Sequence, residues 1–144
     1  MDAAIGGLSR KVEAIQQSLA REQCWVCWMT PNDEAPPLAL SKDEIRLVHH
    51  DYLLDLERRG ILFGAGPFVD DKGQRHGAGM IIIRAKNRAE AEAIAFAEPY
   101  TKAGQRLMTV TPWQRNEGTV NLCLRFADGV LDVDNRRYKL TPAT

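Results

Sequence analysis

The sequence predicts an α+β fold of the ferredoxin-like βαββαβ type, and two patterns indicate it. Short, apolar, β-rich segments recur between residues 24 and 113, and two longer segments with helical periodicity separate them. This order places both helices on one face of an antiparallel sheet. The other face is then apolar and open, so that a second sheet can cover it.

Four segments have the composition of strands. They are residues 24–29 (CWVCWM), 61–69, 80–84 (MIIIR) and 107–113. Gly64, Gly66 and Pro67 interrupt the second one, which permits a β-bulge or a close approach of the backbone to a ligand. A kink in an edge strand explains the same residues, and both interpretations stay open. The proline-rich residues 30–37 and the polar residues 70–79 predict connections.

The two helices begin at recognisable caps. Ser41 and Glu44 form a capping box for a helix over residues 42–59, and Gly60 is its stop signal. Asn87 caps an alanine-rich helix over residues 87–98, which we expect to end at Glu98 because Pro99 follows.

We expect three parts: an amphipathic helix over residues 1–22, a ferredoxin-like domain over 23–117 and a β-hairpin extension over 118–144. Apolar residues 8, 12, 15 and 19 share one face of the first helix, roughly residues 8–22. In the last part, alternating residues flank the hairpin signal Asp128-Gly129, and a further strand is predicted near 138–140.

Composition argues against several classes of function. The 19 basic and 19 acidic residues cancel, and no basic stripe stands out, so a nucleic-acid partner is not expected. No apolar run has the ~18 residues that a membrane span needs, and three cysteines without framework spacing favour a reducing cytoplasm. Cys24 and Cys27 point to opposite faces of one strand, so we expect neither metal nor disulfide there. No cofactor motif is present, and we expect no cofactor.

His49 and Glu98 are the candidate catalytic residues. With Ile45 at zero on a helical wheel, His49 falls at about 40°, on the apolar stripe, and His50 at about 140°, toward solvent or a partner. Glu98 shares a face with Ala91 and Ile94, where a carboxylate is costly to bury unless it meets a donor or a cation. A carboxylate paired with an imidazole orients it for acid–base chemistry. A core histidine and an exposed carboxylate on a last helical turn remain as alternatives.

The order of short motifs resembles the YciI-like (YCII-related) family over residues 23–116. The matching pieces are WVCWM, His49 with its spacing to Gly60-Ile61-Leu62, Ala65-Gly66-Pro67-Phe68, Glu98-Pro99-Tyr100 and Val110-Thr111-Pro112-Trp113. The resemblance implies a ferredoxin-like fold of the dimeric α+β barrel class and a His–Asp catalytic pair. At least one member eliminates chloride from a hydroxylated aromatic ring. Here Glu98 occupies the position of the family aspartate, one methylene longer.

Two functions follow as hypotheses. In the first, the chain is a cofactor-independent lyase or isomerase in which His49 and Glu98 transfer a proton on a cyclic or aromatic oxygenated substrate. In the second, it is a non-catalytic module for small-ligand binding or dimerisation. Both imply a small-molecule ligand of unknown identity and a homodimer. Gly66, Phe68 and Tyr100 are the residues expected to contact that ligand.

Overall fold

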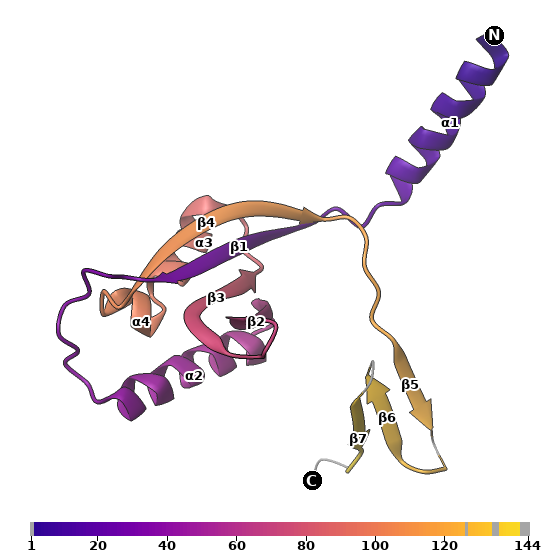
Figure 1. Cartoon of the computed structure of the whole chain (residues 1–144). Coiled ribbons are helices and arrows are strands. Elements are labelled where there is room, and N and C mark those ends of the chain that lie inside the picture. The colour runs from indigo at the N-terminus through magenta and orange to yellow at the C-terminus, as the bar shows by residue number, and fades with distance from the viewer. Residues whose placement is uncertain (1, 126, 134–135, 142–144) are drawn as a thin grey trace. The chain divides into compact units, whose positions relative to one another are not determined.

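The computed structural model describes residues 2–125, 127–133 and 136–141, which form two units (Figure 1). One unit contains residues 21–115, and the other contains residues 1–20 and 116–144. No helix in the described part of the chain is long and apolar enough to cross a membrane.

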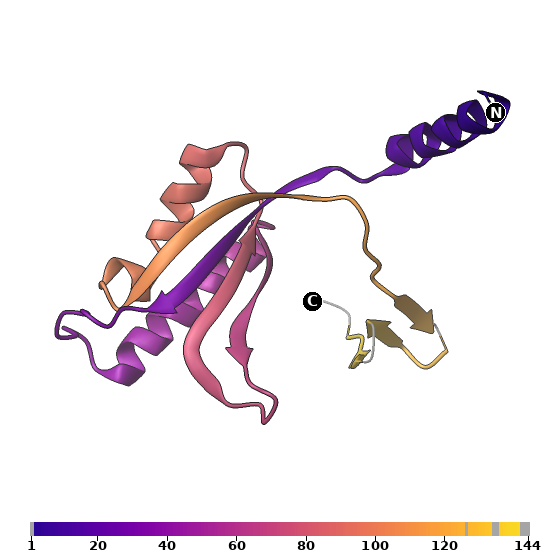
Figure 2. The ribbon, with the colours of Figure 1, turned by 45° about the horizontal axis from the view of Figure 1, so that its top comes forward.

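The larger unit has the predicted α+β architecture. Its elements are β1 (Glu22–Pro31), α2 (Lys42–Arg58), β2 (Leu62–Val69), β3 (Arg75–Ile83), α3 (Arg88–Phe96), α4 (Pro99–Lys102) and β4 (Arg106–Arg115). The four strands pair antiparallel in the order β2-β3-β1-β4, and α2 and α3 lie on the same face (Figures 1 and 2). The ferredoxin-like fold class is therefore confirmed.

The core lies between the sheet and its two helices. Trp25, Cys27 and Met29 alternate along β1 toward the helices, and Ile81 and Ile83 lie beside them on β3. Ala91 and Ala95 of α3 and Met108 of β4 complete this buried cluster. Full burial of a side chain such as Ile83 stabilises the fold by about 1.5–3 kcal/mol. The small alanines let α3 approach the sheet closely.

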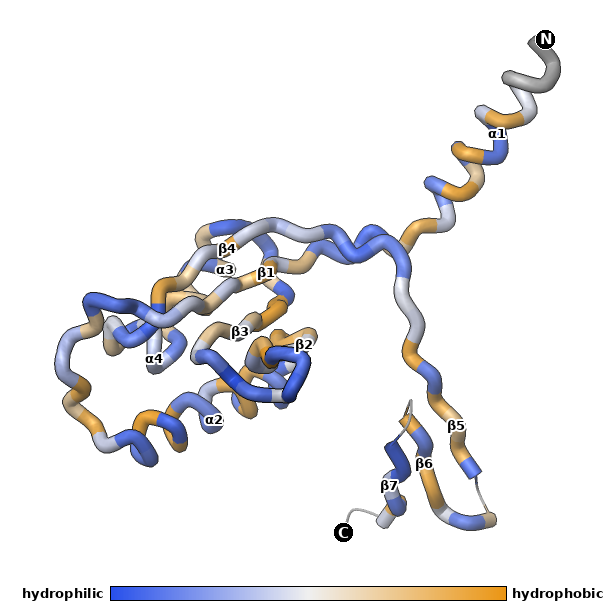
Figure 3. The backbone as a smooth tube through the Cα atoms, viewed as in Figure 1, coloured by the Kyte–Doolittle hydropathy of each residue, from blue (hydrophilic) through white to orange (hydrophobic). Residues whose placement is uncertain are grey.

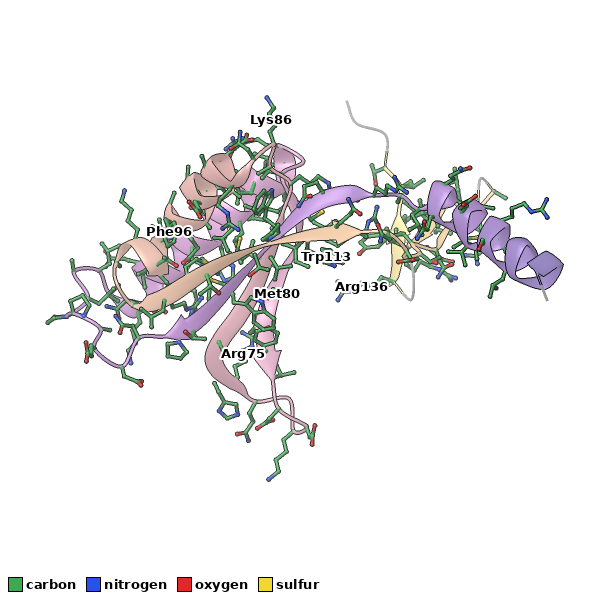
Figure 4. All side chains as sticks on the ribbon, turned by 90° about the horizontal axis from the view of Figure 1, so that it is seen from above. Arg75, Met80, Lys86, Phe96, Trp113 and Arg136 are labelled. Carbon is green, nitrogen blue, oxygen red and sulfur yellow. The ribbon has the colours of Figure 1, made fainter. Side chains whose placement is uncertain are left out.

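The opposite face of the sheet is apolar and open within this unit. Trp28 is 44% exposed, Leu107 56% and Trp113 37%. Trp28 stacks on Phe68 with ring centroids 4.8 Å apart. Figure 4 labels Met80 and Trp113 on this side of the sheet, away from α3. Strand alternation alone predicts such a face, since neighbouring residues point to opposite sides.

The alanine-rich helix ends two residues earlier than predicted, and this changes the role of Glu98. Helix α3 ends at Phe96, and Glu98 is instead the N-cap of the short helix α4, with Pro99 as its first residue. Proline suits that position because its φ is already helical and its missing N–H needs no partner there. The proline therefore ends one helix and begins the next.

The pairing of β2 is irregular, as the glycines and proline in it permit. Its pairing with β3 shifts register between Leu62 and Gly64 and again between Pro67 and Val69. β2 is an edge strand, where Pro67 disturbs no neighbour on its free side. β3 begins earlier than predicted, at Arg75, because Val69 still pairs with it, and the hydrophilic connection is shorter (Figure 3).

The smaller unit contains α1 (Asp2–Ser18) and a three-stranded antiparallel sheet of β5 (Leu122–Arg125), β6 (Val130–Val133) and β7 (Arg136–Lys139). The helix ends earlier than predicted, because Arg21 adopts a left-handed φ of 51° just before β1. On the sheet, hydrogen bonds from Arg137 and Arg125 outweigh the effect of burial and lower the pKa of Asp132 to about 2.

Candidate active site

Helix α2 presents His49 to the interior of the larger unit. The capping box is formed: Ser41 accepts the Glu44 backbone N–H, and Glu44 Oε2 accepts the Ser41 N–H at 2.7 Å. Ile45 and Leu56, at 2% and 1% exposure, anchor the helix to the sheet on either side of His49. The His49 side chain is 13% exposed as a result. Its rotation about the helix axis follows from the apolar stripe on which it lies.

Glu98 is fully buried and accepts four hydrogen bonds. Its Oε1 accepts the Tyr100 amide at 3.1 Å, and its Oε2 accepts the Thr101 amide at 2.9 Å and the Thr101 hydroxyl at 2.8 Å. His49 supplies the fourth bond. Burial alone would raise the pKa of Glu98, but the bonds from His49, Thr101 and the two amides outweigh it and hold the pKa below its usual range. Glu98 is thus kept as a carboxylate.

The two candidate catalytic side chains meet directly. His49 Nδ1 lies 2.6 Å from Glu98 Oε1. An ionised carboxylate only accepts, so in the neutral imidazole Nδ1 carries the proton and Nε2 has a free lone pair. Within the described residues Nε2 has no protein hydrogen-bond partner. This arrangement can accept a proton at Nε2 while Glu98 stabilises the resulting imidazolium.

A cavity of about 370 Å³ lies beside His49. Small residues of the β2–β3 hairpin line this space, among them Ala65, Gly66 and Gly79. A Cβ at Gly79 would lie 2.9 Å from the Gly66 carbonyl oxygen, so the close approach of the two strands requires glycine there. The apolar part of the cavity wall is formed by Met29, Leu53 and Ile81. The cavity volume is sufficient for one small organic ring.

Of the three residues predicted to contact a ligand, two line the cavity and one does not. Gly66 and Tyr100 line the cavity, and the Tyr100 ring makes an edge contact with His49 at 5.2 Å between centroids. Phe68 does not line it; its ring stacks on Trp28 on the open face of the sheet. Glu98 is not exposed in the cavity but lies behind His49.

His50 is exposed, as the wheel indicated, yet it is closer to the site than expected. It lines the cavity, and its ring centroid lies 5.2 Å from that of His49. A side chain about 100° from the helix stripe still reaches a cavity that opens along the edge of the helix. The helical wheel has no information about that opening.

The two cysteines of β1 are buried thiols on opposite faces. Cys27 belongs to the core cluster, and burial raises its pKa to about 11. Burial, followed by the charge of Glu22, also raises the pKa of Cys24. Thiols held protonated in this way are poor nucleophiles and poor metal ligands. The described residues contain no cluster of three or more His, Cys, Asp or Glu side chains that could hold a metal ion.

The sequence analysis missed the three arginines that line the cavity: Arg46, Arg75 and Arg106. Arg46 lies one helical turn before His49, so the helical wheel could have found it. Arg75, labelled in Figure 4, begins β3, and Arg106 begins β4, so only the tertiary fold brings them to the cavity. Thr101 was also missed, because its bonds to Glu98 depend on Glu98 being the N-cap of α4 and not the last residue of α3.

The fold and the site together define a ferredoxin-like domain with a His–carboxylate contact at the wall of a small cavity. The chain belongs to the family of the YCII-related domain, whose model matches residues 24–114. Among solved structures, it is similar to the 5-chloro-2-hydroxyhydroquinone dehydrochlorinase TftG from Burkholderia phenoliruptrix, in complex with 2,5-dihydroxybenzoquinone. The two share 20% identity and a TM-score of 0.48 over 62% of this chain and 92% of that one. No curated protein matches the chain.

Proposed function

We propose that this protein is a cofactor-independent lyase or isomerase that transfers a proton on a cyclic or aromatic oxygenated substrate. The observation that carries the proposal is the buried 2.6 Å contact of His49 Nδ1 with Glu98 Oε1 at the wall of a cavity, which leaves Nε2 available to accept a proton. A carboxylate behind an imidazole fixes its tautomer and stabilises its charged form. The adjoining cavity provides room for a substrate.

In the proposed reaction, His49 Nε2 takes a proton from a C–H of the substrate. The electron pair of that bond moves into the ring. In an elimination, a leaving group such as chloride departs with an electron pair; in an isomerisation, the imidazolium returns the proton to a different atom. Neither course changes the oxidation state of the protein, and Glu98 remains ionised beside the imidazolium.

Exchange of substrate protons in D2O tests the proposal, because it detects proton abstraction without net turnover. The panel consists of chlorinated and unchlorinated polyhydroxybenzenes and cyclic 1,3-diketones, with chloride release measured in parallel. We expect His49→Gln to lower the exchange rate by about 10²–10⁴-fold, the usual contribution of a positioned general base. His76→Gln, which changes a histidine outside the cavity, is the matched control.

The second candidate is a binding module without turnover, and one observation favours it. Glu98 joins α2 to α4 through His49, Tyr100 and Thr101, so the pair also has a purely structural use. If panel compounds bind in the cavity but no proton exchanges, this candidate replaces the enzyme.

We further propose that the chain forms a homodimer through the open face of the sheet. The exposed apolar side chains of that face, among them Trp28, Leu107 and Trp113, support the proposal. Light scattering should give about twice the 16.1 kDa of one chain at micromolar concentration. Trp28→Glu should reduce the mass to one chain, whereas Leu47→Glu, on an exposed position of α2, should not. A monomeric wild-type protein contradicts the dimer.

A further inference from the structure

The walls of the cavity beside His49 carry positive charge that the proton-transfer pair does not use. Arg46, Arg75 and Arg106 line it together with His49 and His50, while no Asp or Glu of the described chain lines it. Glu98 does not line the cavity: it is fully buried behind His49, and its oxygens accept hydrogen bonds from Tyr100 and Thr101. The chain as a whole is neutral, so this local excess is a property of the site.

Arg106 is the most enclosed of the three arginines. Its guanidinium carbon lies 4.2 Å from the centroid of the Tyr100 ring, and its Nη1 lies 3.8 Å from Met29 Sδ. The ring and the sulfur hold the guanidinium in place without neutralising it. The ion pairs of the described residues do not include Arg106 or Arg75, in contrast to Arg84, Arg88 and Arg115. A half-buried guanidinium without a carboxylate retains its capacity to bind an anion.

Tyr100 connects this cation to the candidate catalytic histidine. One contact of its ring is with the His49 imidazole, at 5.2 Å between centroids, and another is with the Arg106 guanidinium. Both groups line the same cavity, whose volume of about 370 Å³ suits one ring with its substituents. A ligand can therefore meet Arg106 with one end while it presents a reacting atom to His49.

Arg46 has a lesser part in this arrangement. Its side chain is 64% exposed and contacts Asp43, which does not line the cavity. Arg75 is also exposed but has no carboxylate partner within the described residues. The charge that a bound ligand meets is therefore carried mainly by the half-buried Arg106, and the exposed Arg75 adds to it.

We infer that the substrate of the proposed enzyme binds as an anion, with a planar oxyanion held by Arg106 and assisted by Arg75. The inference rests on the proposed function for the use of the site, although the anion site itself requires no turnover. Guanidinium groups form two parallel hydrogen bonds with a planar oxyanion, which orients the ligand as well as binding it. A carboxylate and an ionised ring hydroxyl share this chemistry, and the test separates them.

Two pairs of probes with matched shapes test the inference. Benzoate is compared with benzamide, and 4-nitrophenolate with 4-nitroanisole, by NMR titration of the full chain at constant ionic strength above neutral pH. We expect each favoured anion to bind about tenfold more tightly than its neutral counterpart, with shifts at the Tyr100 and Gly66 amides. Preference for benzoate identifies a carboxylate site, and preference for 4-nitrophenolate identifies a ring-oxyanion site.

Variants test whether Arg106 is responsible for the preference for the anion over its neutral counterpart. Arg106→Gln should remove the roughly tenfold preference for the anion, and Arg106→Lys should restore part of it, since a lysine keeps the charge but loses the paired hydrogen bonds. Arg75→Gln should have a smaller effect. Arg59→Gln is the matched control, because Arg59 is exposed on α2, pairs with Asp55 and does not line the cavity.

The outcomes separate this inference from the proposed reaction. Equal binding of anion and neutral probe, no binding of either anion at millimolar concentration, or a preference unchanged in Arg106→Gln overturns the anion site. His49→Gln should lower the rate of proton exchange by about 10²–10⁴-fold and keep the anion preference. If no compound exchanges protons but the preference depends on Arg106, the reaction is refuted and the anion site stands.

Discussion

Two histidine–carboxylate contacts of this protein differ in burial and in the sequence distance between the partners, although both join an imidazole to a carboxylate. His49 and Glu98 are 13% and 0% exposed and 2.6 Å apart, on segments far apart in sequence. His76 and Asp70 are 66% and 36% exposed and 2.9 Å apart, across the hydrophilic β2–β3 turn (Figure 3). A contact between a histidine and a carboxylate is therefore no evidence of a site by itself. Burial and an adjoining cavity distinguish the first pair from the second.

The contact between His76 and Asp70 belongs to the structure of the β2–β3 turn. Asp70 Oδ1 accepts the backbone N–H groups of Lys72 and Gln74, both at 2.9 Å, so the aspartate organises the turn. The bond from His76 and those amides lower the pKa of Asp70. Water competes for every one of these bonds, which makes an exposed ion pair contribute little to stability. The buried pair has no such competition.

The largest expected difference between the pairs is in stability. Glu98→Ala leaves the Tyr100 and Thr101 amides and His49 without their acceptor, and should lower the free energy of unfolding by about 3 kcal/mol. Asp70→Ala should have a clearly smaller effect. Urea unfolding of both variants measures this, with α2 helicity checked by circular dichroism. Equal losses would mean that burial does not distinguish the two pairs.

An intermediate effect is expected in acid. The folded state holds the pKa of Glu98 below its unfolded value of about 4.3, so the carboxylate stabilises the fold at pH values above that. This contribution is lost as the pH falls through the lower, folded pKa.

Unfolding experiments from pH 7 to pH 3 measure this loss. The stability of wild type relative to Glu98→Gln should decrease as the pH falls below about 4.3. Asp70→Asn should show the same sign, since the pKa of Asp70 is also lowered, but a weaker dependence because the group is exposed. A difference between wild type and Glu98→Gln that does not vary with pH contradicts the assignment.

The smallest expected difference between the two pairs is in the tautomer of the neutral histidine. His49 contacts Glu98 through Nδ1, whereas His76 contacts Asp70 through Nε2. In their neutral forms the proton should lie on Nδ1 of His49 and mainly on Nε2 of His76. Ring nitrogen NMR shifts report this, and Glu98→Gln should allow His49 a mixture of tautomers. A wild-type His49 protonated at Nε2 would leave no lone pair for the proposed base.

Local signals account for much of what the sequence predicted. The capping box at Ser41, the alternation along β1 and the turn residues each depend on neighbours within a few positions. Pro99 shows the limit of such signals, because the same residue ends a helix or begins one. The sequence predicts a helix end there, whereas in the structure α4 begins at Pro99 and Glu98 is its N-cap, where a negative charge is favourable.

Periodicity and spacing are local properties of the chain, so they were sufficient to predict the order of elements and the rotation of His49 toward the core. The order of the short motifs was sufficient to indicate the family. Tertiary structure alone decided that Glu98 reaches His49, that Phe68 lies on the other face and that Arg75 and Arg106 join Tyr100 at one cavity. These contacts join residues from different strands and helices. No local pattern encodes them, because they depend on sheet register and on the small residues that leave the cavity open.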